Sequence, residues 1–456
     1  MISFRHLSRK RILIKMNNKL LVYWQESHLK NYLTNSKLIR STLIYTSSNI
    51  AVAIVPFILL PIMTKYLSTS DYGTIANFFL LVSFTGCFVG VNVHGAIMVA
   101  YYEKDTVDLP LYIKNCFYII IVSVLVVGAA YWGFGNYISK YTTIPFSWLW
   151  TIIVISSIQM LIAINLNLWR INSKAFKYSA FQVTQTLITL GLAVWFVVFL
   201  GKGWQGRVGA TFITILIYGI ISIFFLYKEG WLKGKYSINK EYFKGAFLFG
   251  LFLIPHGLGL IILQLADRLF ITNMVGISET GIYSVGSQVG MAITLITNSF
   301  LLAFQPWLYE KLSEGNPDSY KKIVVMTYMF VIGTVIIAVI LGISAPIIIS
   351  IFVDTKFSGS YQYVLWLGLG YGFYAIYSLF INFIAYTKKT RIISMITIFA
   401  CVVNITLNYF LIQRFGAIGA AYATCFAYLC MVVLAIKYVL REFNDISWFP
   451  FIKQVS

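Results

Sequence analysis

Residues Leu265–Gly286 read LADRLFITNMVGISETGIYSVG, and two features of this stretch bear on the fold. Its second half, from Thr272, echoes TKYLSTSDYGTIANF, which begins 208 residues earlier at Thr64. Its first half ends a long apolar run with the charged pair Asp267–Arg268, in a place where charges are costly. The echo predicts a chain built from two related halves, with a charge pair near the start of the second.

The apolar runs between charged residues indicate a membrane protein. Of the 456 residues, 59% are hydrophobic and 11% are charged, which leaves too few polar groups to cover a soluble globular surface. Twelve runs without Asp, Glu, Lys or Arg reach 20 residues or more, the length of a helix that crosses a bilayer. These runs are 41–64, 72–102, 115–139, 141–169, 178–201, 208–227, 245–266, 280–309, 323–353, 357–387, 392–413 and 415–436. The alternating segments of a membrane β-barrel do not appear.

The basic residues predict the orientation of these helices. If the N-terminus lies inside and the spans alternate, the inner segments hold 28 of the 35 Lys and Arg residues and the outer segments hold 7. This bias is what the positive-inside rule predicts for a protein with both termini in the cytoplasm. The net charge of +20 then reflects topology and attraction to anionic membrane lipids, and no nucleic-acid partner is expected.

Three motif pairs recur at nearly one offset, which predicts a parallel repeat. The offset contains six spans, and an even number returns the chain to the same side, so both halves have one orientation. The pairs are Ser70-Asp71-x-Gly73 with Ser278-Glu279-x-Gly281, Gly206-x-x-Gly209-Ala210 with Gly416-x-x-Gly419-Ala420, and Asn167-x6-Lys174 with Asn382-x6-Lys389. The acidic residues are expected to cap helices at the outer face, and the glycines to let helices approach closely in the 5–6 and 11–12 hairpins.

The predicted fold is therefore an all-α polytopic membrane protein with about twelve transmembrane helices in two six-helix bundles. Its expected parts are a basic cytoplasmic N-terminal segment (1–40), a first bundle (41–227), a basic cytoplasmic linker (228–244), a second bundle (245–440) and a cytoplasmic tail (441–456). Met1 and Met16 both remain open as the first residue.

The short loops favour a transporter over an enzyme. No outer segment exceeds about 15 residues, which leaves no room for an extracytoplasmic catalytic domain, and no GxxxxGK[ST] loop or His/Cys array occurs. The five cysteines all lie in the apolar runs and are expected to pack as small apolar groups. No catalytic residue, cofactor or metal is expected.

Several stretches resemble the polysaccharide-biosynthesis flippases of the Wzx type. These belong to the superfamily that includes the multidrug MATE transporters and the lipid II flippases. The matching stretches are LPIMTKYLSTSDYGTIANF (Leu60–Phe78), Glu241–Gly286 with the Ala266-Asp267-Arg268 pattern, and NITLNYFLIQRFGAIGAAYAT (Asn404–Thr424). The chain departs from the family at MVAYYEKD (Met98–Asp105), where an Arg is often found.

The resemblance implies two bundles around a central cavity and translocation of an undecaprenyl-pyrophosphate-linked oligosaccharide by alternating access. It implies the bacterial inner membrane as the location, and a polysaccharide polymerase and a chain-length regulator as further partners. Such a cargo needs cations for phosphate and amides or hydroxyls for sugar.

Two accounts of Asp267 and Arg268 stay open. In one, Arg268 snorkels to the interface and Asp267 neutralises it. In the other, Arg268 and Lys65 hold a pyrophosphate at the outer mouth and Asp267 holds Arg268 between cargo molecules. The polar residues within the spans complete the set of candidate substrate contacts: His94, His256, Gln159, Gln264 and Gln288.

Two other functions are weighed against the flippase. A MATE-like, cation-coupled drug exporter would need buried carboxylates, and the first span, Ser41–Thr64, has none. A non-transporting scaffold for polysaccharide assembly is the third possibility. A basic cavity would favour an anionic lipid-linked cargo, whereas an acidic cavity would favour a drug or cation exporter.

Overall fold

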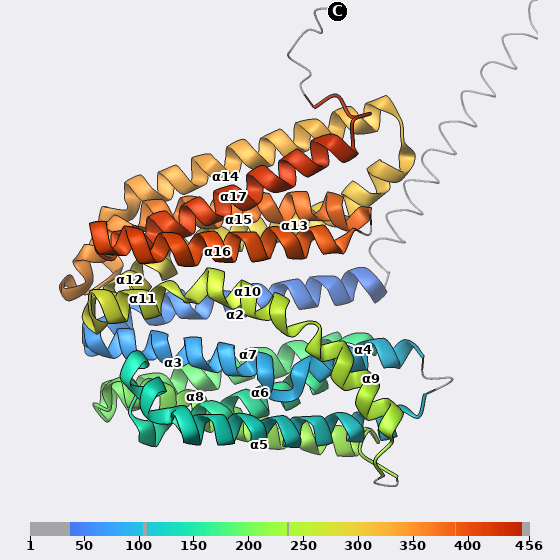
Figure 1. Cartoon of the computed structure of the whole chain (residues 1–456), viewed down its shortest axis with the longest axis vertical. Helices are drawn as coiled ribbons and strands as arrows, with labels where there is room; N and C mark the ends of the chain where they lie inside the picture. The colour runs from blue at the N-terminus through green and yellow to red at the C-terminus, as the bar shows by residue number, and fades with distance from the viewer. Residues whose placement is uncertain (1–36, 104–106, 235–236, 388, 449–456) are drawn as a thin grey trace, which may run out of the picture.

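Two bundles of long helices lie side by side in the computed structural model (Figure 1). The structure describes residues 37–103, 107–234, 237–387 and 389–448. Within these residues, twelve helical segments are long and apolar enough to cross a membrane, as the sequence predicted. The basic segment before residue 37, both candidate start residues and the end of the tail lie outside the described residues.

The first half runs from α2 to α8, blue to green in Figure 1. Its second span is broken by a short 3₁₀ turn at Val89–Asn92, where Gly90, Val91 and Asn92 all have positive φ. The elements are α2 (Lys37–Tyr66), α3 (Thr69–Phe88), η1 (Val89–Asn92), α4 (Val93–Tyr102), α5 (Leu109–Thr142), η2 (Phe146–Trp148), α6 (Leu149–Ile171), α7 (Ala175–Val194), η3 (Trp195–Phe199) and α8 (Gly203–Lys228).

The second half runs from α9 to α17, and Figure 1 shows α13 to α17 together in the other bundle. The elements are α9 (Lys240–Leu251), α10 (Ile254–Leu265), α11 (Asp267–Met274), α12 (Ile277–Gly290), α13 (Ala292–Glu314), α14 (Pro317–Phe352), η4 (Thr355–Ser360), α15 (Tyr361–Tyr386), α16 (Thr390–Phe415) and α17 (Ile418–Glu442).

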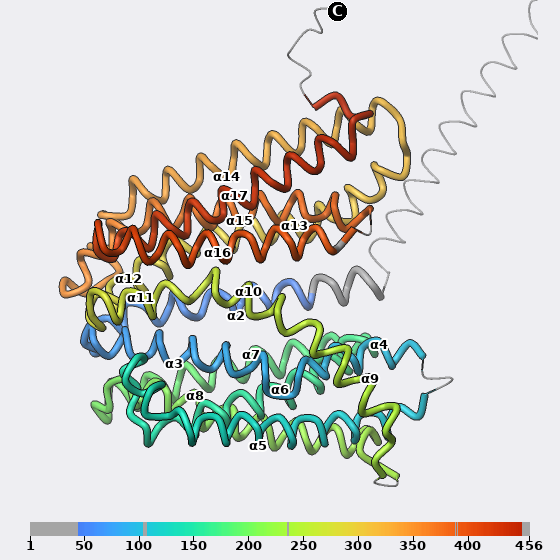
Figure 2. The backbone as a smooth tube through the Cα atoms, viewed as in Figure 1, coloured from blue at the N-terminus to red at the C-terminus, as the bar shows by residue number. Residues whose placement is uncertain are grey.

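The seventh span, Lys240–Leu265, is bent between α9 and α10 and connects the two halves. Figure 2 follows it from the first bundle, beside α4 and α5, to the space between the bundles. On the α9 side, a Cβ at Gly250 would meet the Val91 carbonyl oxygen at 1.5 Å, so only glycine permits this approach. On the α10 side, Leu263 packs in the core of the second bundle.

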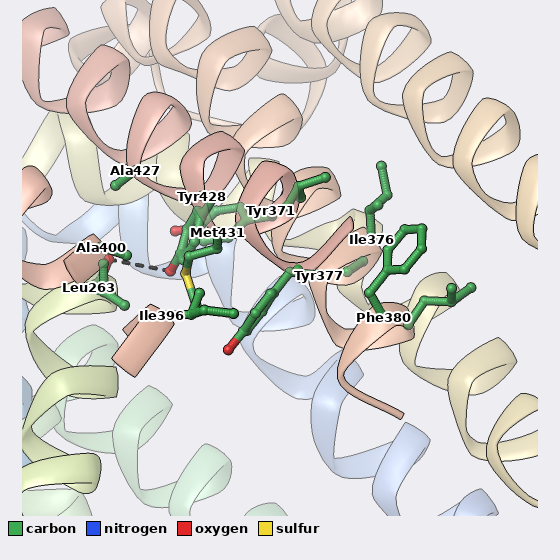
Figure 3. Close-up of a cluster of buried hydrophobic side chains, with 14 of the residues drawn as sticks. Leu263, Tyr371, Ile376, Tyr377, Phe380, Ile396, Ala400, Ala427, Tyr428 and Met431 are labelled. Atoms are coloured by element: carbon green, nitrogen blue, oxygen red, sulfur yellow. Dashed lines mark hydrogen bonds between the residues drawn. The ribbon is translucent and has the colours of Figure 1, made fainter. Parts of the chain in front are cut away.

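The core of the second bundle is rich in tyrosine (Figure 3). Tyr371, Tyr377 and Tyr428 are buried among aliphatic side chains of α15, α16 and α17. The Tyr428 hydroxyl donates to the Leu263 carbonyl at 3.3 Å, the contact drawn as a dashed line in Figure 3. This bond and the surrounding packing attach α10 to the second bundle.

The repeated glycine motifs pack helix hairpins, as predicted. A Cβ at Gly206 of α8 would lie 3.1 Å from the Phe196 backbone, and a Cβ at Gly419 of α17 would lie 2.3 Å from the Leu411 backbone. Each glycine thus lets the last helix of its half lie against the chain that precedes it. The same role in both halves supports the repeat.

The two copies of the Ser-Asp/Glu-x-Gly motif pack against each other. A Cβ at Gly73 of α3 would meet the Ile277 carbonyl oxygen at 2.2 Å, and a Cβ at Gly281 of α12 would meet the Thr69 carbonyl oxygen at 1.9 Å. Both pairs obey the 208-residue offset, so the contact is reciprocal, as a two-fold relation between halves requires. We call the end of the molecule that holds these motifs the corner end; α3 and α12 close it.

The caps at the corner end differ between the halves. Ser68 and Asp71 form a capping box at the start of α3, and Asp71 also accepts from the Trp204 backbone N–H at 3.3 Å. In the second half, Gly276 precedes α12 and offers no side chain, while Glu279 accepts a hydrogen bond from the Tyr363 hydroxyl. The predicted capping role therefore holds for Asp71, whereas Glu279 joins α12 to α15.

Candidate functional site

A cavity of about 460 Å³ lies between the two halves, and we call it the central cavity. Its wall comes from α2, α3 and α8 of the first half and from α10, α11 and α12 of the second. Most lining residues are apolar, and the polar ones are Tyr72, Ser83, Arg207, Arg268, Ser284, Ser287 and Gln288. Two cations and no carboxylate line this cavity.

Arg268 is held in a buried network at the wall of the central cavity. Its side chain donates to Asp267 Oδ1 at 3.1 Å, to the Gln264 carbonyl at 2.8 Å and to Ser287 Oγ at 3.2 Å. Only 7% of Arg268 is exposed. The account in which Arg268 snorkels to the interface is therefore wrong, because its guanidinium is buried and bonds to Asp267, to the Gln264 carbonyl and to Ser287 of α12.

Asp267 stands behind Arg268 and is 3% exposed. It accepts a hydrogen bond from the Tyr283 hydroxyl of α12 through its second oxygen, so both carboxylate oxygens have partners. The Tyr371 hydroxyl of α15 and Ser287 Oγ lie 2.7 Å apart and extend the network to a third helix. A buried charge pair is costly unless its hydrogen bonds are satisfied, and here α12 and α15 supply the partners.

Arg207 is the second cation of the central cavity. Its Nη1 donates to Thr211 Oγ1 one turn later at 3.0 Å, and its guanidinium lies 5.5 Å from the centre of the Phe79 ring. No ion pair of Arg207 occurs among the described residues. Because Arg268 has a counter-ion and Arg207 has none, the cavity carries net positive charge.

Gln288 joins three helices across the boundary between the halves. Its Nε2 donates to the Pro56 carbonyl of α2 at 2.5 Å, and its Oε1 accepts from the Tyr72 hydroxyl of α3 at 3.3 Å. The Tyr72 ring packs edge-on against Phe357. Gln288 thus lines the cavity and also links α12 to α2 and α3 of the first half.

The structure places the other predicted contacts elsewhere. Lys65 is exposed at the end of α2 and does not line the central cavity; its carbonyl accepts from Lys356 Nζ at 3.0 Å. The side chain of Gln264 is exposed, and Gln159 lines a neighbouring cavity within the first half. His94 on α4 and His256 on α10 are half-buried, and each Nδ1 lacks a hydrogen-bond partner in the described part of the chain.

Sequence reasoning about the site missed Arg207, although the repeat contained a signal. Arg207 lies inside the first GxxGA motif, and Ala417 occupies the same place in the second. A charge that one copy of a repeated structural motif carries and the other lacks is not needed for the packing that both copies share. Such a departure from the repeat could have directed attention to Arg207.

No group of three or more His, Cys, Asp or Glu side chains that could hold a metal ion occurs among the residues that the structure describes. The free cysteines of this part are buried or half-buried.

Comparisons with known proteins identify relatives along most of the chain. The family described as "Polysaccharide biosynthesis protein" matches residues 38–312, and the family described as MatE matches residues 255–410. A protein of the Lsg locus of Haemophilus influenzae is 23% identical over 383 residues, covering 81% of this chain and 90% of the relative. An uncharacterised membrane protein of the same organism is 24% identical over 402 residues, covering 86% and 92%.

Solved structures share the fold. The lipid II flippase MurJ in an inward closed conformation matches with a TM-score of 0.62 and 19% identity, over 90% of each chain. A multidrug resistance MATE family transporter of the MOP superfamily, in an inward-facing conformation, matches with a TM-score of 0.61 and 15% identity, over 88% of this chain and 96% of that one. At these identities the likeness concerns the fold.

Proposed function

Because this chain belongs to the polysaccharide biosynthesis protein family, and its family and fold are those of MOP-superfamily membrane transporters and flippases, we propose that its cargo is an undecaprenyl-pyrophosphate-linked oligosaccharide repeat unit. In this proposal the chain moves the repeat unit from the cytoplasmic to the outer leaflet of the bacterial inner membrane. Both termini and the basic loops face the cytoplasm, and the corner end faces outward.

The observation that carries this proposal is the net positive central cavity between the halves. Arg207 and Arg268 line it from opposite halves, and no carboxylate lines it. A guanidinium offers a planar fork of donors that suits phosphate oxygens, so two of them can share one diphosphate. A cationic drug would meet like charge in the same place, so the cavity favours an anionic cargo over the cargo of a drug exporter.

The placement of the two arginines also suits alternating access. Each half supplies one cation, so a diphosphate bound between them gives the halves a common ligand while the bundles change their relative orientation. Asp267 balances Arg268 in the absence of cargo, and its hydrogen bond from Tyr283 keeps the carboxylate in place. Lys65, exposed at the corner end, is then a candidate contact for the diphosphate as it leaves.

A genetic experiment tests the function. The gene is deleted, and undecaprenyl-linked repeat units are measured in each leaflet of the inner membrane. The proposal expects accumulation on the cytoplasmic leaflet and its reversal by the wild-type gene. A protein that only assembles a polymerase or a chain-length regulator would leave translocation intact, so normal distribution between leaflets in the deletion strain contradicts the proposal.

Variants of the two arginines connect the function to the cavity. Arg207→Ala and Arg268→Ala should fail to reverse the accumulation when compared at equal protein levels. Arg414→Ala is the matched control, because Arg414 is exposed at the corner end and does not line the cavity. Full activity of both cavity variants would show that the cavity is not the cargo site.

A further inference from the structure

A second cavity, of about 350 Å³, lies within the first half, and we call it the glutamine pocket. Three glutamines line it, Gln159 from α6 and Gln182 and Gln185 from α7. Thr186, Thr189 and Thr211 add hydroxyl groups, and aliphatic side chains of α2 and α8 complete the wall. The volume lies within the usual range for small-molecule sites, about 300–1,000 Å³.

The three glutamine amides make no hydrogen bond to the described part of the chain. No side-chain hydrogen bond of Gln159, Gln182 or Gln185 occurs among the described residues, and the buried Oε1 of Gln182 lacks a partner. The threonine hydroxyls, in contrast, bond to the backbone of their own helices or to Arg207. The pocket therefore presents amide donors and acceptors that the fold itself does not use.

Such amides are unusual inside membrane-spanning helices. All three glutamines lie within the spans Phe146–Ile171 and Ala175–Phe199. A polar group without a partner at this depth is costly, so polar residues in spans normally bond to one another or line a polar path. One buried amide oxygen without a partner, on Gln182, and two further amides around the same cavity are therefore available to a ligand.

The pocket adjoins the central cavity. Pro56, Leu59 and Arg207 line both cavities, so Arg207 borders the diphosphate site on one side and the glutamines on the other. A ligand that has a charged group at Arg207 and a neutral polar group attached to it could occupy both cavities at once. A lipid-linked glycan has this order, with its first sugar bonded directly to the diphosphate.

We propose that the glutamine pocket is the sugar subsite and binds the first sugar of the cargo beside the diphosphate; this inference rests on the proposed function. Each amide group provides two donors and one acceptor, which suit sugar hydroxyl and acetamido groups. The aliphatic wall at Val52, Val55 and Ile215 gives an apolar surface for the ring face. A site built on hydrogen bonds rejects ligands that lack the matching groups, so this pocket selects among glycans.

The test separates sugar binding from diphosphate binding. The variant Gln159→Leu/Gln182→Leu/Gln185→Leu is expressed in the source cells, where surface polysaccharide is measured, and is also purified as the full chain. Binding of undecaprenyl diphosphate, which has no sugar, is then measured by calorimetry. Leucine keeps the volume and removes the amides. The matched control is Gln305→Leu/Gln362→Leu/Gln413→Leu, at three exposed glutamines of the second half.

We expect the pocket variant to lower surface polysaccharide by about tenfold or more, because several hydrogen bonds to one sugar are lost together. Its affinity for undecaprenyl diphosphate should stay within about twofold of wild type, whereas Arg207→Ala should lose that affinity. Gln159→Leu alone, at an exposed side chain that bonds to none of the described residues, should give a smaller fall in polysaccharide and preserve protein level.

Two outcomes overturn the sugar subsite and leave the proposed function standing. In the first, cells with the pocket variant make as much surface polysaccharide as cells with the control variant. The other is a loss of undecaprenyl diphosphate affinity in the pocket variant as large as in Arg207→Ala. If the wild-type chain itself does not bind undecaprenyl diphosphate, the proposed diphosphate site fails, and the sugar subsite that depends on it fails too.

Discussion

At the scale of single residues, the Asp267–Arg268 pair shows how a charge pair is retained in an apolar chain. Both side chains are buried, and each has hydrogen-bond partners from α12. Removing one member of such a pair is far more costly than the pair itself, because an uncompensated charge remains. The pair therefore also connects α11 to α12, apart from any contact with cargo.

The first prediction separates these two roles of Arg268. Arg268→Ala should abolish surface polysaccharide beyond any fall in protein level, and Arg268→Lys should rescue it only in part, because an ammonium lacks the planar fork that suits phosphate. The measurement combines a blot of the membrane fraction with a stain for polysaccharide in the same cells. Normal polysaccharide in Arg268→Ala cells would rule out a cargo contact.

Because Arg268→Ala leaves Asp267 unpaired, the double variant Asp267→Asn/Arg268→Ala is the control for stability. It removes both charges and should restore protein level if the single variant reduces it. Polysaccharide should still be absent, since the cation is missing. Export by the double variant would show that the pair serves folding alone.

Glu229, which follows the last residue of α8, is another carboxylate with basic partners, and it allows a prediction about pH. It accepts from Lys174 at 2.9 Å, Lys177 at 3.1 Å and Trp169 Nε1 at 3.1 Å, and so joins α8 to α6 and the start of α7. Burial raises the pKa of this carboxyl, but the hydrogen bonds from Lys174, Lys177 and Trp169 outweigh it and bring the pKa below the ordinary 4.5.

A carboxyl whose pKa is lower in the folded state stabilises the protein above its unfolded pKa, and this contribution disappears as the pH falls through the folded value. We therefore expect Glu229→Gln to lower the melting temperature of the purified protein at pH 7. The difference from wild type should shrink as the pH falls below 4.5. A difference that stays constant to acid pH would mean that Glu229 acts without its charge.

At the scale of elements, the contact between α3 and α12 decides whether the corner end is closed. Gly73 and Gly281 bring the two helix starts into backbone contact, and Asn77 of α3 donates to Thr272 Oγ1 of α11 at 2.9 Å nearby. These contacts join elements of different halves. Opening of the corner end therefore requires α3 to separate from α11 and α12.

The prediction for these elements is that Gly281→Ala and Gly73→Ala shift the protein toward states with an open corner. The added methyl group would overlap backbone oxygen atoms, which costs about 1–3 kcal/mol in the closed state and nothing in the open one. The measurement is the distance between spin labels at Lys202 and Ser358, which are exposed at the corner end on different halves. A longer distance is expected.

Gly86→Ala is the matched control for this experiment. Gly86 lies on α3 as well, but a Cβ there would meet no atom within 4 Å, so the label distance should not change. An unchanged distance in Gly73→Ala and Gly281→Ala would show that the helices adjust locally, and would argue against a gate at this contact.

At the scale of the whole molecule, the packing contacts occur in both halves, whereas the candidate site occurs once. The packing glycines recur in both halves, at Gly73 and Gly281 and at Gly206 and Gly419. Arg207 has Ala417 at the equivalent place, so the first half alone carries this cation. A symmetric frame can change conformation as two rigid halves, whereas an asymmetric cavity can bind an asymmetric cargo.

The orientation of the whole molecule gives the last prediction. The excess of Lys and Arg in one set of loops predicts that both termini lie in the cytoplasm. Alkaline phosphatase fused after Ser456 folds only outside the cytoplasm, so this fusion should be inactive, while a fusion in the loop after Thr142 should be active. An active fusion at the C-terminus would show that the predicted orientation is wrong.

The amino-acid sequence by itself determined the membrane class, the number of spans and the repeat. These depend on local properties: the length of apolar runs, the position of charges and the recurrence of short motifs such as Ser-Asp/Glu-x-Gly. The close approach of GxxGA glycines could also be predicted, since small residues have one main use between membrane helices. Arg268 and Gln288 could be named as candidates because polar groups in spans are rare.

Only the tertiary structure decided which of these groups share a cavity. Arg207 and Arg268 are 61 residues apart and lie on different halves, so no local pattern connects them. Lys65 is nearer to the corner motif in sequence, yet it is exposed outside the central cavity. The bend of the seventh span and the reciprocal contact of α3 with α12 set these positions, because packing between distant helices determines which side chains meet.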